Sequence, residues 1–461
     1  MAERKNDFTK GKISTAILGM SLPIMAAQLV NVLYNIVDRI YIGHLPENGS
    51  LAFTGLGLCL PITTIASAFS VLCGMGGAPL CSIERGRGDI DKAERIMGNS
   101  FCILLIVALL LTFGGQLLMR PILYAFGASD ETFPYAQAYC SVYIWGNLFV
   151  LISLGMNSFI NSQGFARIGM CTVAIGAVLN IILDPVFIFA LHMGVRGAAV
   201  ATVIAQACSA VWVMQFLTGK RAIMKLRLRY IRLSPGTTGK IISLGVASFN
   251  MKITNAVVQV AANRLLKEFG GDLYVGIMTA INSVREVVMM PVQGLTSGSE
   301  PVIGYNYGAK RYDRVLESIR FMARTAIAYN TVVWLIILIV PTWLMRVFVT
   351  DEAMLAPGAA AFRIYYAGYV LMALQFSAQS TFVALGQSKK AIFFSLLRKV
   401  IVVVPLMFLL PHIGSLGTDG VFLAEPISDV IGGFASFITM LVTVAIPMKK
   451  LASELPNANG Q

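Results

Sequence analysis

The chain has 461 residues, of which 56% are hydrophobic and only 13% are charged, whereas about 25% of the residues in a typical soluble domain are charged. Together with a mean hydropathy of +0.73, this composition excludes a soluble globular protein and predicts an integral membrane protein. The formal net charge of +13 is compatible with nucleic-acid binding, but the basic residues follow a membrane topology, so we expect no nucleic-acid partner.

Twelve apolar stretches are long enough to cross a hydrocarbon core of about 30 Å as helices. In chain order, the predicted spans cover residues 13–42, 52–79, 96–119, 134–160, 166–192, 196–218, 239–267, 274–303, 319–345, 358–385, 391–411 and 419–447. The predicted fold is therefore all-α, with twelve transmembrane helices. The first stretch is too long for a signal-peptide core and lacks a following cleavage site, so we expect it to be retained.

The basic residues alternate between the two ends of the predicted spans. Most of them lie in the even-numbered loops and the two tails, while the odd-numbered loops hold only Arg120, Arg196, Lys267 and Arg346. Cytoplasmic loops carry the excess of Lys and Arg. We therefore expect both termini to face the cytoplasm.

The two halves of the chain resemble each other at a constant offset of 222 residues. The offset is kept by six pairs: Pro79 and Pro301, Gly86 and Gly308, Asp91 and Asp313, Tyr143 and Tyr365, Gly146 and Gly368, and Gly164 and Gly386. The Pro, Gly and Asp pairs end an even-numbered span and begin a charged loop, which favours a structural role: proline kinks a helix, glycine permits the turn, and aspartate can cap the next helix.

Six spans in each half give two pseudo-symmetric lobes with the same orientation, that is, parallel repeats. The predicted divisions are a first lobe over residues 1–219, a basic cytoplasmic linker over 220–240, and a second lobe with a short cytoplasmic tail over 241–461. Transporters built from such repeats bind their substrate between the halves and alternate access around it.

An acidic residue lies in the middle of the first apolar span. Asp38 shares one helical face with Asn31, Tyr34 and Asn35, which are spaced by three, four and seven residues. A carboxylate in a transmembrane segment is costly and usually faces a cavity as an ion or proton site. The structural alternative is pairing with the neighbouring Arg39, which a helix disfavours because adjacent residues point in different directions.

Three further spans of the first lobe carry polar pairs one helical turn apart. These pairs are Asn180 and Asp184, Thr202 and Gln206, and Asn157 and Asn161. Polar faces avoid lipid, so we expect a common cavity. Two carboxyl groups with amide and hydroxyl oxygens would hold a sodium ion or one shared proton. A structural alternative is that Asp184 caps the helix break at Pro185.

The second lobe has a different set of polar residues. Gln375 and Gln379 lie in one predicted span and Glu425 and Asp429 in another, where the two acids are four residues apart. Together with Met289 and Met290, whose side chains suit adaptable apolar pockets, they are candidates for the substrate cavity, the acids as partners of a cationic substrate. Arg285, Glu286 and Glu300 are candidate coupling groups or members of local ion pairs.

Motifs of ATP hydrolysis and of nucleophilic or metal-dependent catalysis are absent. There is no GxxxxGK[ST] phosphate loop, no HExxH motif and no CxxC pair. We therefore expect no enzymatic activity and no cofactor, and transport would draw its energy from an ion gradient.

The ordered set of motifs resembles the multidrug and toxic compound extrusion (MATE) family over essentially the whole chain. The matching features are Pro23, Tyr34–Asp38 and Ile42-Gly43 in the first span, the doubled Pro/Gly/Asp signature, Asn180 and Asp184, and the run Gly194, Gly197 and Ala198–Thr202. The first span is most similar to the MepA-like bacterial branch.

The resemblance implies a secondary active multidrug antiporter that exports organic cations in exchange for H+ or Na+ and confers drug resistance. In several family members a first-lobe cation site is built from residues that match Asp38, Asn180, Asp184 and Thr202. Another branch of the family places coupling acids in spans 7 and 10. In this chain span 7 has no central acid, and span 10 has glutamines instead. Its partners would be small organic cations and the bilayer, and we expect a monomer.

Two other functions compete with this one. A lipid-linked saccharide flippase of the same broad superfamily would need a positively charged cavity for a pyrophosphate, whereas the first lobe is acidic and rich in amides. A membrane-embedded transferase would need a cluster of acids or histidines at a loop–membrane boundary for metal-phosphate chemistry, and the sequence has no such cluster.

Overall fold

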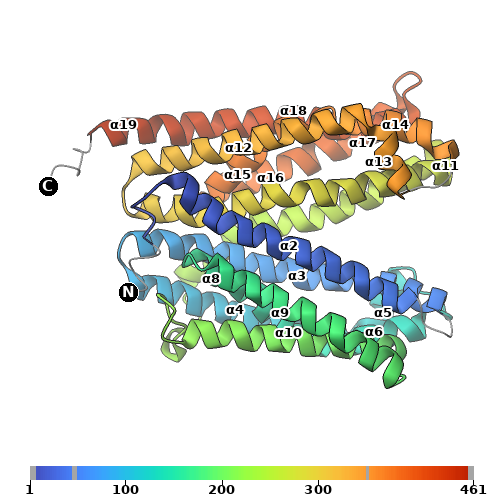
Figure 1. Cartoon of the computed structure of the whole chain (residues 1–461), viewed down its shortest axis with the longest axis horizontal. Helices are drawn as coiled ribbons and strands as arrows, with labels where there is room; N and C mark the ends of the chain where they lie inside the picture. Colours follow the sequence, from blue (N-terminus) through green and yellow to red (C-terminus); the bar gives the residue numbers. More distant parts are fainter. Residues whose placement is uncertain (1–6, 44–48, 349–351, 455–461) are drawn as a thin grey trace. The chain divides into compact units, whose positions relative to one another are not determined.

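The structure, a computed structural model, describes residues 7–43, 49–348 and 352–454. The side chains of residues 35, 39, 40, 42, 43, 49–54 and 348 are not among those described. Within these ranges every regular element is a helix, as the sequence predicts (Figure 1).

The first half of the chain consists of six spans, three of them divided. Its helices are α2 (Ile13–Gly43), α3 (Gly49–Gly86), α4 (Ile90–Leu117), α5 (Met119–Ala125), α6 (Phe133–Trp145), α7 (Asn147–Leu151), η1 (Ile152–Met156), α8 (Asn157–Ser162), α9 (Ala166–Pro185), η2 (Val186–Ala190) and α10 (Gly194–Thr218). Between α10 and α11 the chain forms one short 3₁₀ helix, η3 (Leu228–Tyr230), and α11 begins at Pro235 within the predicted linker.

The second half repeats the pattern. Its helices are α11 (Pro235–Gly308), α12 (Tyr312–Ile339), α13 (Pro341–Phe348), η4 (Glu352–Met354), α14 (Leu355–Tyr365), α15 (Tyr369–Ala384), α16 (Ser388–Leu396), η5 (Leu397–Val403), α17 (Val404–Leu409), η6 (Leu410–His412), α18 (Gly417–Met440), η7 (Leu441–Ala445) and α19 (Ile446–Glu454).

The twelve predicted spans are all present as helices. In the described ranges, nine helices are long and apolar enough to cross a membrane, or ten with the bent pair that includes α6 and α7. Helix α11 is two spans joined at Gly271, whose φ of 71° is not helical. The remaining predicted span, 358–385, is divided between α14 and α15. The all-α, twelve-helix fold class is confirmed.

The repeat in the sequence corresponds to a repeat in backbone conformation. Gly146 follows α6 and Gly368 precedes α15, so the fourth span of each half is broken at the same place. Gly164 and Gly386, which follow these broken spans, have φ values of 88° and 69°. This left-handed conformation favours glycine because it has no Cβ, which explains why both halves use glycine there.

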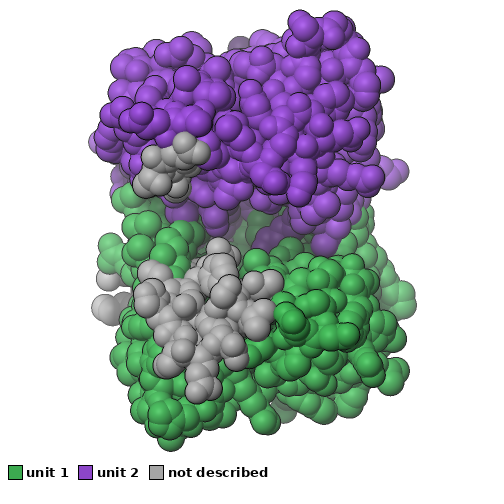
Figure 2. Space-filling view, turned by 90° about the vertical axis from the view of Figure 1, so that its right-hand side faces the viewer, with its two compact units in different colours: residues 1–7, 22–249 green, residues 8–21, 250–461 purple. Residues whose placement is uncertain are grey.

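The chain forms two compact units, and each is described separately (Figure 2). Unit 1 consists chiefly of Leu22–Phe249, and unit 2 of Phe8–Ser21 with Asn250–Gln461. The first part of α2 thus packs with the second half of the chain, and the first part of α11 packs with the first half. The lobe boundaries at 219 and 241 stay a prediction.

Each unit has its own apolar core. In unit 1, Met97, Leu104, Met156 and Phe159 from α4, η1 and α8 are fully buried. In unit 2, Ile281, Phe362, Tyr366 and Phe422 are buried in one apolar cluster. Inside a membrane such side chains stabilise each unit through close van der Waals packing, because lipid is as apolar as the core.

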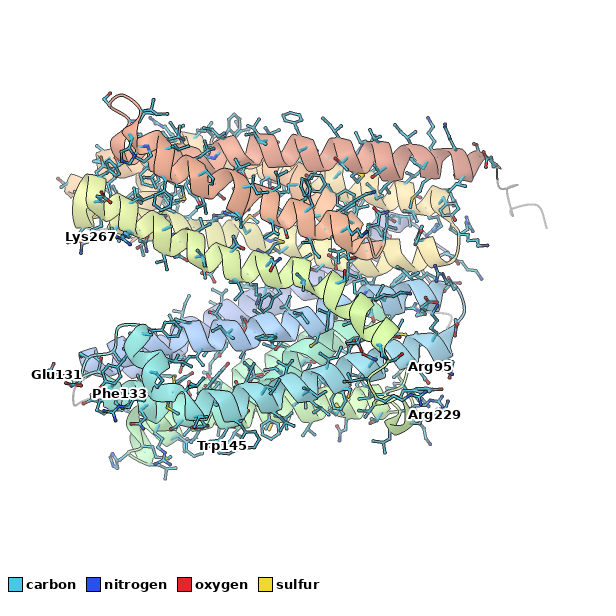
Figure 3. All side chains as sticks on the ribbon, turned by 180° about the vertical axis from the view of Figure 1, so that it is seen from behind. Arg95, Glu131, Phe133, Trp145, Arg229 and Lys267 are labelled. Atoms are coloured by element: carbon cyan, nitrogen blue, oxygen red, sulfur yellow. The ribbon has the colours of Figure 1, made fainter. Side chains whose placement is uncertain are left out.

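The basic linker is attached to unit 1 through buried polar side chains. The Gln163 Oε1 atom accepts hydrogen bonds from the backbone N–H groups of Ile223 and Met224 at 2.8 and 2.9 Å. Glu94 accepts one from Lys225 N at 2.9 Å and pairs with Arg227. Arg95 and Arg229 both lie against the Tyr230 ring and are labelled near one another in Figure 3. The linker is therefore an ordered part of unit 1.

Glycine permits the close contact of α3 with the first part of α11 inside unit 1. A Cβ on Gly76 would lie 2.2 Å from Ile241 O, and one on Gly245 would lie 2.0 Å from Leu72 O. Atoms at these distances overlap, so any larger side chain would separate the two backbones.

We expect Gly245→Ala to destabilise the protein by about 1–3 kcal/mol because the added methyl group overpacks this crossing. The measurement is thermal unfolding of the purified protein in detergent. Gly239→Ala on the same helix is the control, because a Cβ there meets nothing within 4 Å. Equal unfolding temperatures for Gly245→Ala and wild type would contradict the prediction.

Candidate functional site

Two buried residues of α9 and one of α10 form the centre of the candidate site in unit 1. Asn180 and Asp184 lie one turn apart on α9, and Thr202 faces them from α10; the three are 2%, 0% and 4% exposed. Asn180 Nδ2 donates to Asp184 Oδ1 and to Thr202 Oγ1, both at 3.2 Å. The structure thus brings these three predicted site residues together, while their role as an ion site stays a prediction.

Asp38 lies beside this group. Its side chain is 8% exposed and is close enough to Asp184 for a side-chain hydrogen bond between the two carboxyl groups. Tyr139 on α6 lies near both Asp38 and Tyr34. Residues more than 140 positions apart in the sequence thus meet in one unit. Two carboxyl groups at this separation need a proton or a cation between them, since two bare carboxylates repel each other.

Two oxygen atoms of the site lack a hydrogen-bond partner. Asn180 Oδ1 and Asp184 Oδ2 are buried and accept no hydrogen bond from the described residues. Asp184 also has no ion-pair partner among the described residues. It lies next to Pro185, where α9 ends, and its Oδ1 atom accepts the hydrogen bond from Asn180. Buried polar atoms normally have a partner, and unpaired amide and carboxylate oxygens are hard ligands for a proton or an alkali cation.

The other predicted cavity residues of unit 1 have separate roles in the structure. Asn157 donates to Gly169 O at 3.2 Å and accepts from Thr172 at 3.0 Å, which joins α8 to α9. Gln206 accepts from Ser153 Oγ at 2.5 Å. These hydrogen bonds join neighbouring helices. That Asn157 and Gln206 line the cavity stays a prediction.

The remaining predictions for unit 1 concern four residues. Asn161 Oδ1 is buried without a hydrogen-bond partner in the described part of the chain, and Asn31 is exposed on α2. The side chains of Asn35 and Arg39 lie outside the described residues, so the pairing of Asp38 with Arg39 is not tested.

In unit 2 the two acids of α18 form ion pairs with basic residues. Glu425 and Asp429 are 6% and 2% exposed. Arg398 bridges them at 2.9 and 2.8 Å, and Lys399 Nζ contacts both Glu425 oxygens at 2.7 and 3.0 Å. Arg285 also contacts Glu425, at 2.9 Å. Binding of a cationic substrate by these acids stays a prediction. It would require the substrate to displace the basic side chains that now pair with them.

Arg398 and Lys399 are missing from the sequence-based candidates. The rule that singles out Asp38 also applies to them, since they are two consecutive basic residues inside the predicted apolar span 391–411. Of the sequence-based candidates, Arg285 completes the charged cluster that Arg398 and Lys399 form with Glu425 and Asp429. Glu286 is exposed, and Glu300 accepts a hydrogen bond from Ser380 at 3.0 Å.

The uncharged candidates of unit 2 are buried. Gln379 donates to Ala391 O at 2.9 Å, and the Oε1 atoms of Gln375 and Gln379 have no partner among the described residues. Met289 Sδ accepts from the Tyr369 hydroxyl at 3.8 Å, and Met290 is 8% exposed. Their part in a substrate cavity stays a prediction.

No group of three or more His, Cys, Asp or Glu side chains in the described ranges could hold a metal ion. The unit 1 site offers two carboxyl groups together with the neutral oxygens of Asn180 and Thr202. These are hard oxygen donors of the kind that hold a proton or an alkali cation.

Comparison with known proteins agrees with this architecture. A family model described as MatE matches residues 23–186 and 247–409, one segment in each half. The multidrug export protein MepA of Staphylococcus haemolyticus is 24% identical over 441 residues, which are 95% of each chain.

Solved structures share the fold. A structure of a MATE in the bent conformation has a TM-score of 0.90 and 21% identity, covering 97% of this chain and 98% of that one. A MOP superfamily transporter from Pyrococcus furiosus, described as having a binding pocket of reverse polarity, has a TM-score of 0.87 and 22% identity, with 96% and 98% coverage. At these identities the likeness concerns the fold, and the polarity of the site has to be argued from this chain's own residues.

Proposed function

The chain belongs to the MatE family, and on that premise we propose that it is a secondary active transporter that exports organic cations across the bacterial cytoplasmic membrane in exchange for H+ or Na+. The names of its relatives, multidrug export proteins, support drugs as cargo. We also propose that it acts as a monomer. Both termini would lie in the cytoplasm, an orientation that the distribution of basic residues favours.

One observation carries the ion-coupling proposal. Asp38 and Asp184 meet in the interior of unit 1, and buried oxygens of Asn180 and Asp184 there lack partners in the described part of the chain. An intramembrane acid pair needs a compensating positive charge. A proton or a sodium ion supplies that charge reversibly, which is what an exchange cycle requires.

The mechanism follows from the location of the pair on α2 and α9. When the site is open to the outside, H+ or Na+ binds between Asp38 and Asp184. The bound ion removes the repulsion between the acids, so α2 moves toward α9 and the cavity contracts, which expels the cargo. Release of the ion to the cytoplasm restores the repulsion and reopens the cavity for the next organic cation.

The experiment is efflux of ethidium from proteoliposomes that contain the wild-type protein. An inward proton gradient and an inward sodium gradient are imposed separately. Efflux that depends on one gradient supports the proposal and identifies the ion. Absence of ethidium efflux under both gradients, with correctly inserted protein, would contradict cation export and favour the lipid-linked saccharide flippase.

Thr202→Val tests the neutral oxygens of the site. The Thr202 hydroxyl accepts from Asn180 at 3.2 Å, and loss of ligand-orienting partners typically weakens ion binding about 10–100-fold. We expect the concentration of the coupling ion that gives half-maximal efflux to rise by about that factor, while the maximal rate changes less. Thr331→Val on α12 is the control, because that hydroxyl bonds only its own helix, at Ile327 O. An unchanged ion dependence in Thr202→Val would contradict a role for this oxygen.

A further inference from the structure

Five charged residues of unit 2 form a cluster to which the proposed transport cycle gives no role. The cluster consists of Arg285 on α11, Arg398 and Lys399 on η5, and Glu425 and Asp429 on α18. Glu425 Oε1 lies 2.9 Å from Arg285 Nη2, 2.9 Å from Arg398 Nη1 and 2.7 Å from Lys399 Nζ. The two guanidinium groups are therefore neighbours around a single carboxylate oxygen.

The arginine that bridges the two acids uses only one of its three nitrogens. Arg398 Nη1 donates to Glu425 at 2.9 Å and to Asp429 at 2.8 Å, whereas Nε and Nη2 have no partner among the described residues. The Arg398 side chain is only 5% exposed. Even so, neither nitrogen is among the fully enclosed polar atoms without a partner in the described part of the chain. Both nitrogens therefore border open space beside the cluster.

The unused edge of Arg398 has the geometry of a carboxylate site. The N–H bonds of Nε and Nη2 point in parallel, and such a pair donates to both oxygens of one carboxylate. Arg285 adds a donor nearby: its Nη1 donates to the Tyr365 hydroxyl at 2.5 Å and its Nη2 contacts Glu425, but its Nε has no partner in the described ranges. The donors left over in the cluster thus belong to two adjacent guanidinium groups.

The charge of the cluster agrees with a bound monoanion. Three basic side chains face two acids, so the fully ionised cluster has one net positive charge, and an uncompensated charge inside a membrane is costly. Loss of a proton from a basic group would also remove this charge, but it would leave the Arg398 edge without the partner that a buried donor normally has. A pyrophosphate would bring more negative charge than the cluster compensates.

We propose that the Nε–Nη2 edge of Arg398, with Arg285 beside it, is a binding site for a carboxylate group in unit 2. The carboxylate belongs either to a cargo molecule that also carries a positive charge or to a small free carboxylate. The first case rests on the proposed function and adds zwitterions to the exported cations. In both cases Glu425 and Asp429 keep their contacts with Arg398 Nη1, so the ion pairs of the cluster persist when the site is filled.

The cargo case is tested with two dyes that differ only at the carboxyl group. Rhodamine B has a free carboxylate beside its cationic ring system, and its ethyl ester has the same ring system without that charge. Binding to the purified full-length protein in detergent is measured by fluorescence polarisation, with empty micelles subtracted. We expect wild type to bind rhodamine B about tenfold more tightly than the ester, because only the acid accepts the two charged hydrogen bonds.

The free-carboxylate case is tested by thermal unfolding of the same protein with benzoate or with benzamide, its neutral analogue, at equal ionic strength. A ligand that binds the folded state stabilises it, so we expect benzoate to raise the midpoint by about 2–4 °C and benzamide to leave it unchanged. A dye preference without a benzoate effect assigns the carboxylate to the cargo. A benzoate effect without a dye preference assigns it to a free ion.

Arg398→Lys keeps the positive charge between the two acids but lacks the parallel donors, so it should abolish the dye preference and the benzoate effect. Arg320→Lys, at an exposed position of α12, is the matched control and should retain both. Absence of both effects in wild type, or their persistence in Arg398→Lys, would overturn the proposal, as would greater stabilisation by inorganic pyrophosphate than by benzoate. If Arg398→Lys does not fold, the wild-type comparisons alone decide. Equal binding of both dyes would leave cation export intact, so the two proposals fail separately.

Discussion

Asp38→Asn is expected to abolish exchange-driven ethidium efflux. Asparagine preserves the size of the side chain but carries neither a charge nor a titratable proton. Because Asp38 and Asp184 lie within hydrogen-bonding distance in the interior of unit 1, removal of one charge leaves a site that no longer needs H+ or Na+ between the two side chains. The measurement is the initial rate of efflux from proteoliposomes, which should fall to that of protein-free vesicles.

The control for this variant is Asp419→Asn. Asp419 is an exposed residue of the first turn of α18, and the same chemical change there should leave efflux at the wild-type rate. Both variants are compared at equal amounts of inserted protein. Wild-type efflux by Asp38→Asn would show that coupling lies elsewhere, and the buried acids of unit 2 would become the candidates.

Glu425→Gln is expected to destabilise unit 2 strongly. Glu425 is 6% exposed and contacts Arg285, Arg398 and Lys399, so its neutralisation leaves three basic groups with Asp429 as the one remaining acid of the cluster. Removal of one partner from a buried ion pair costs about 3–5 kcal/mol, because the other charge stays buried without compensation. Thermal unfolding of the purified protein in detergent should show a clearly lower midpoint than wild type.

Glu286→Gln is the matched control for this loss of stability. Glu286 lies on α11 next to Arg285 in the sequence but is exposed, and exposed charges contribute about 0–1 kcal/mol. An unchanged midpoint for Glu425→Gln would mean that the cluster contributes no net stability.

Local features of the sequence determined much of the architecture. Apolar stretches of sufficient length have one stable arrangement in lipid, the helix, because every backbone polar group must be satisfied within the segment. The breaks were also local: Gly146 and Gly368 divide equivalent spans, and Gly164 and Gly386 adopt the left-handed conformation that glycine favours.

The residues of the unit 1 site could also be predicted from local features of the sequence. Asp38 and Asp184 are conspicuous because acids are costly in apolar spans, and helical spacing places Asn180 on the same face as Asp184. That α2, α9 and α10 bring these residues together was expected from their polar faces and from the resemblance. The structure places the residues side by side and adds the hydrogen bonds of Asn180.

Contacts between helices were decided by the tertiary structure alone. The sequence does not show that Glu425 and Asp429 are neutralised by Arg398 and Lys399, since these pairs join residues 26–31 positions apart on different helices. Nor does it show that the first parts of α2 and α11 pack with the opposite halves of the chain. Periodicity reports which face of a helix is polar, but the partner of that face depends on the packing of side chains from all neighbouring helices.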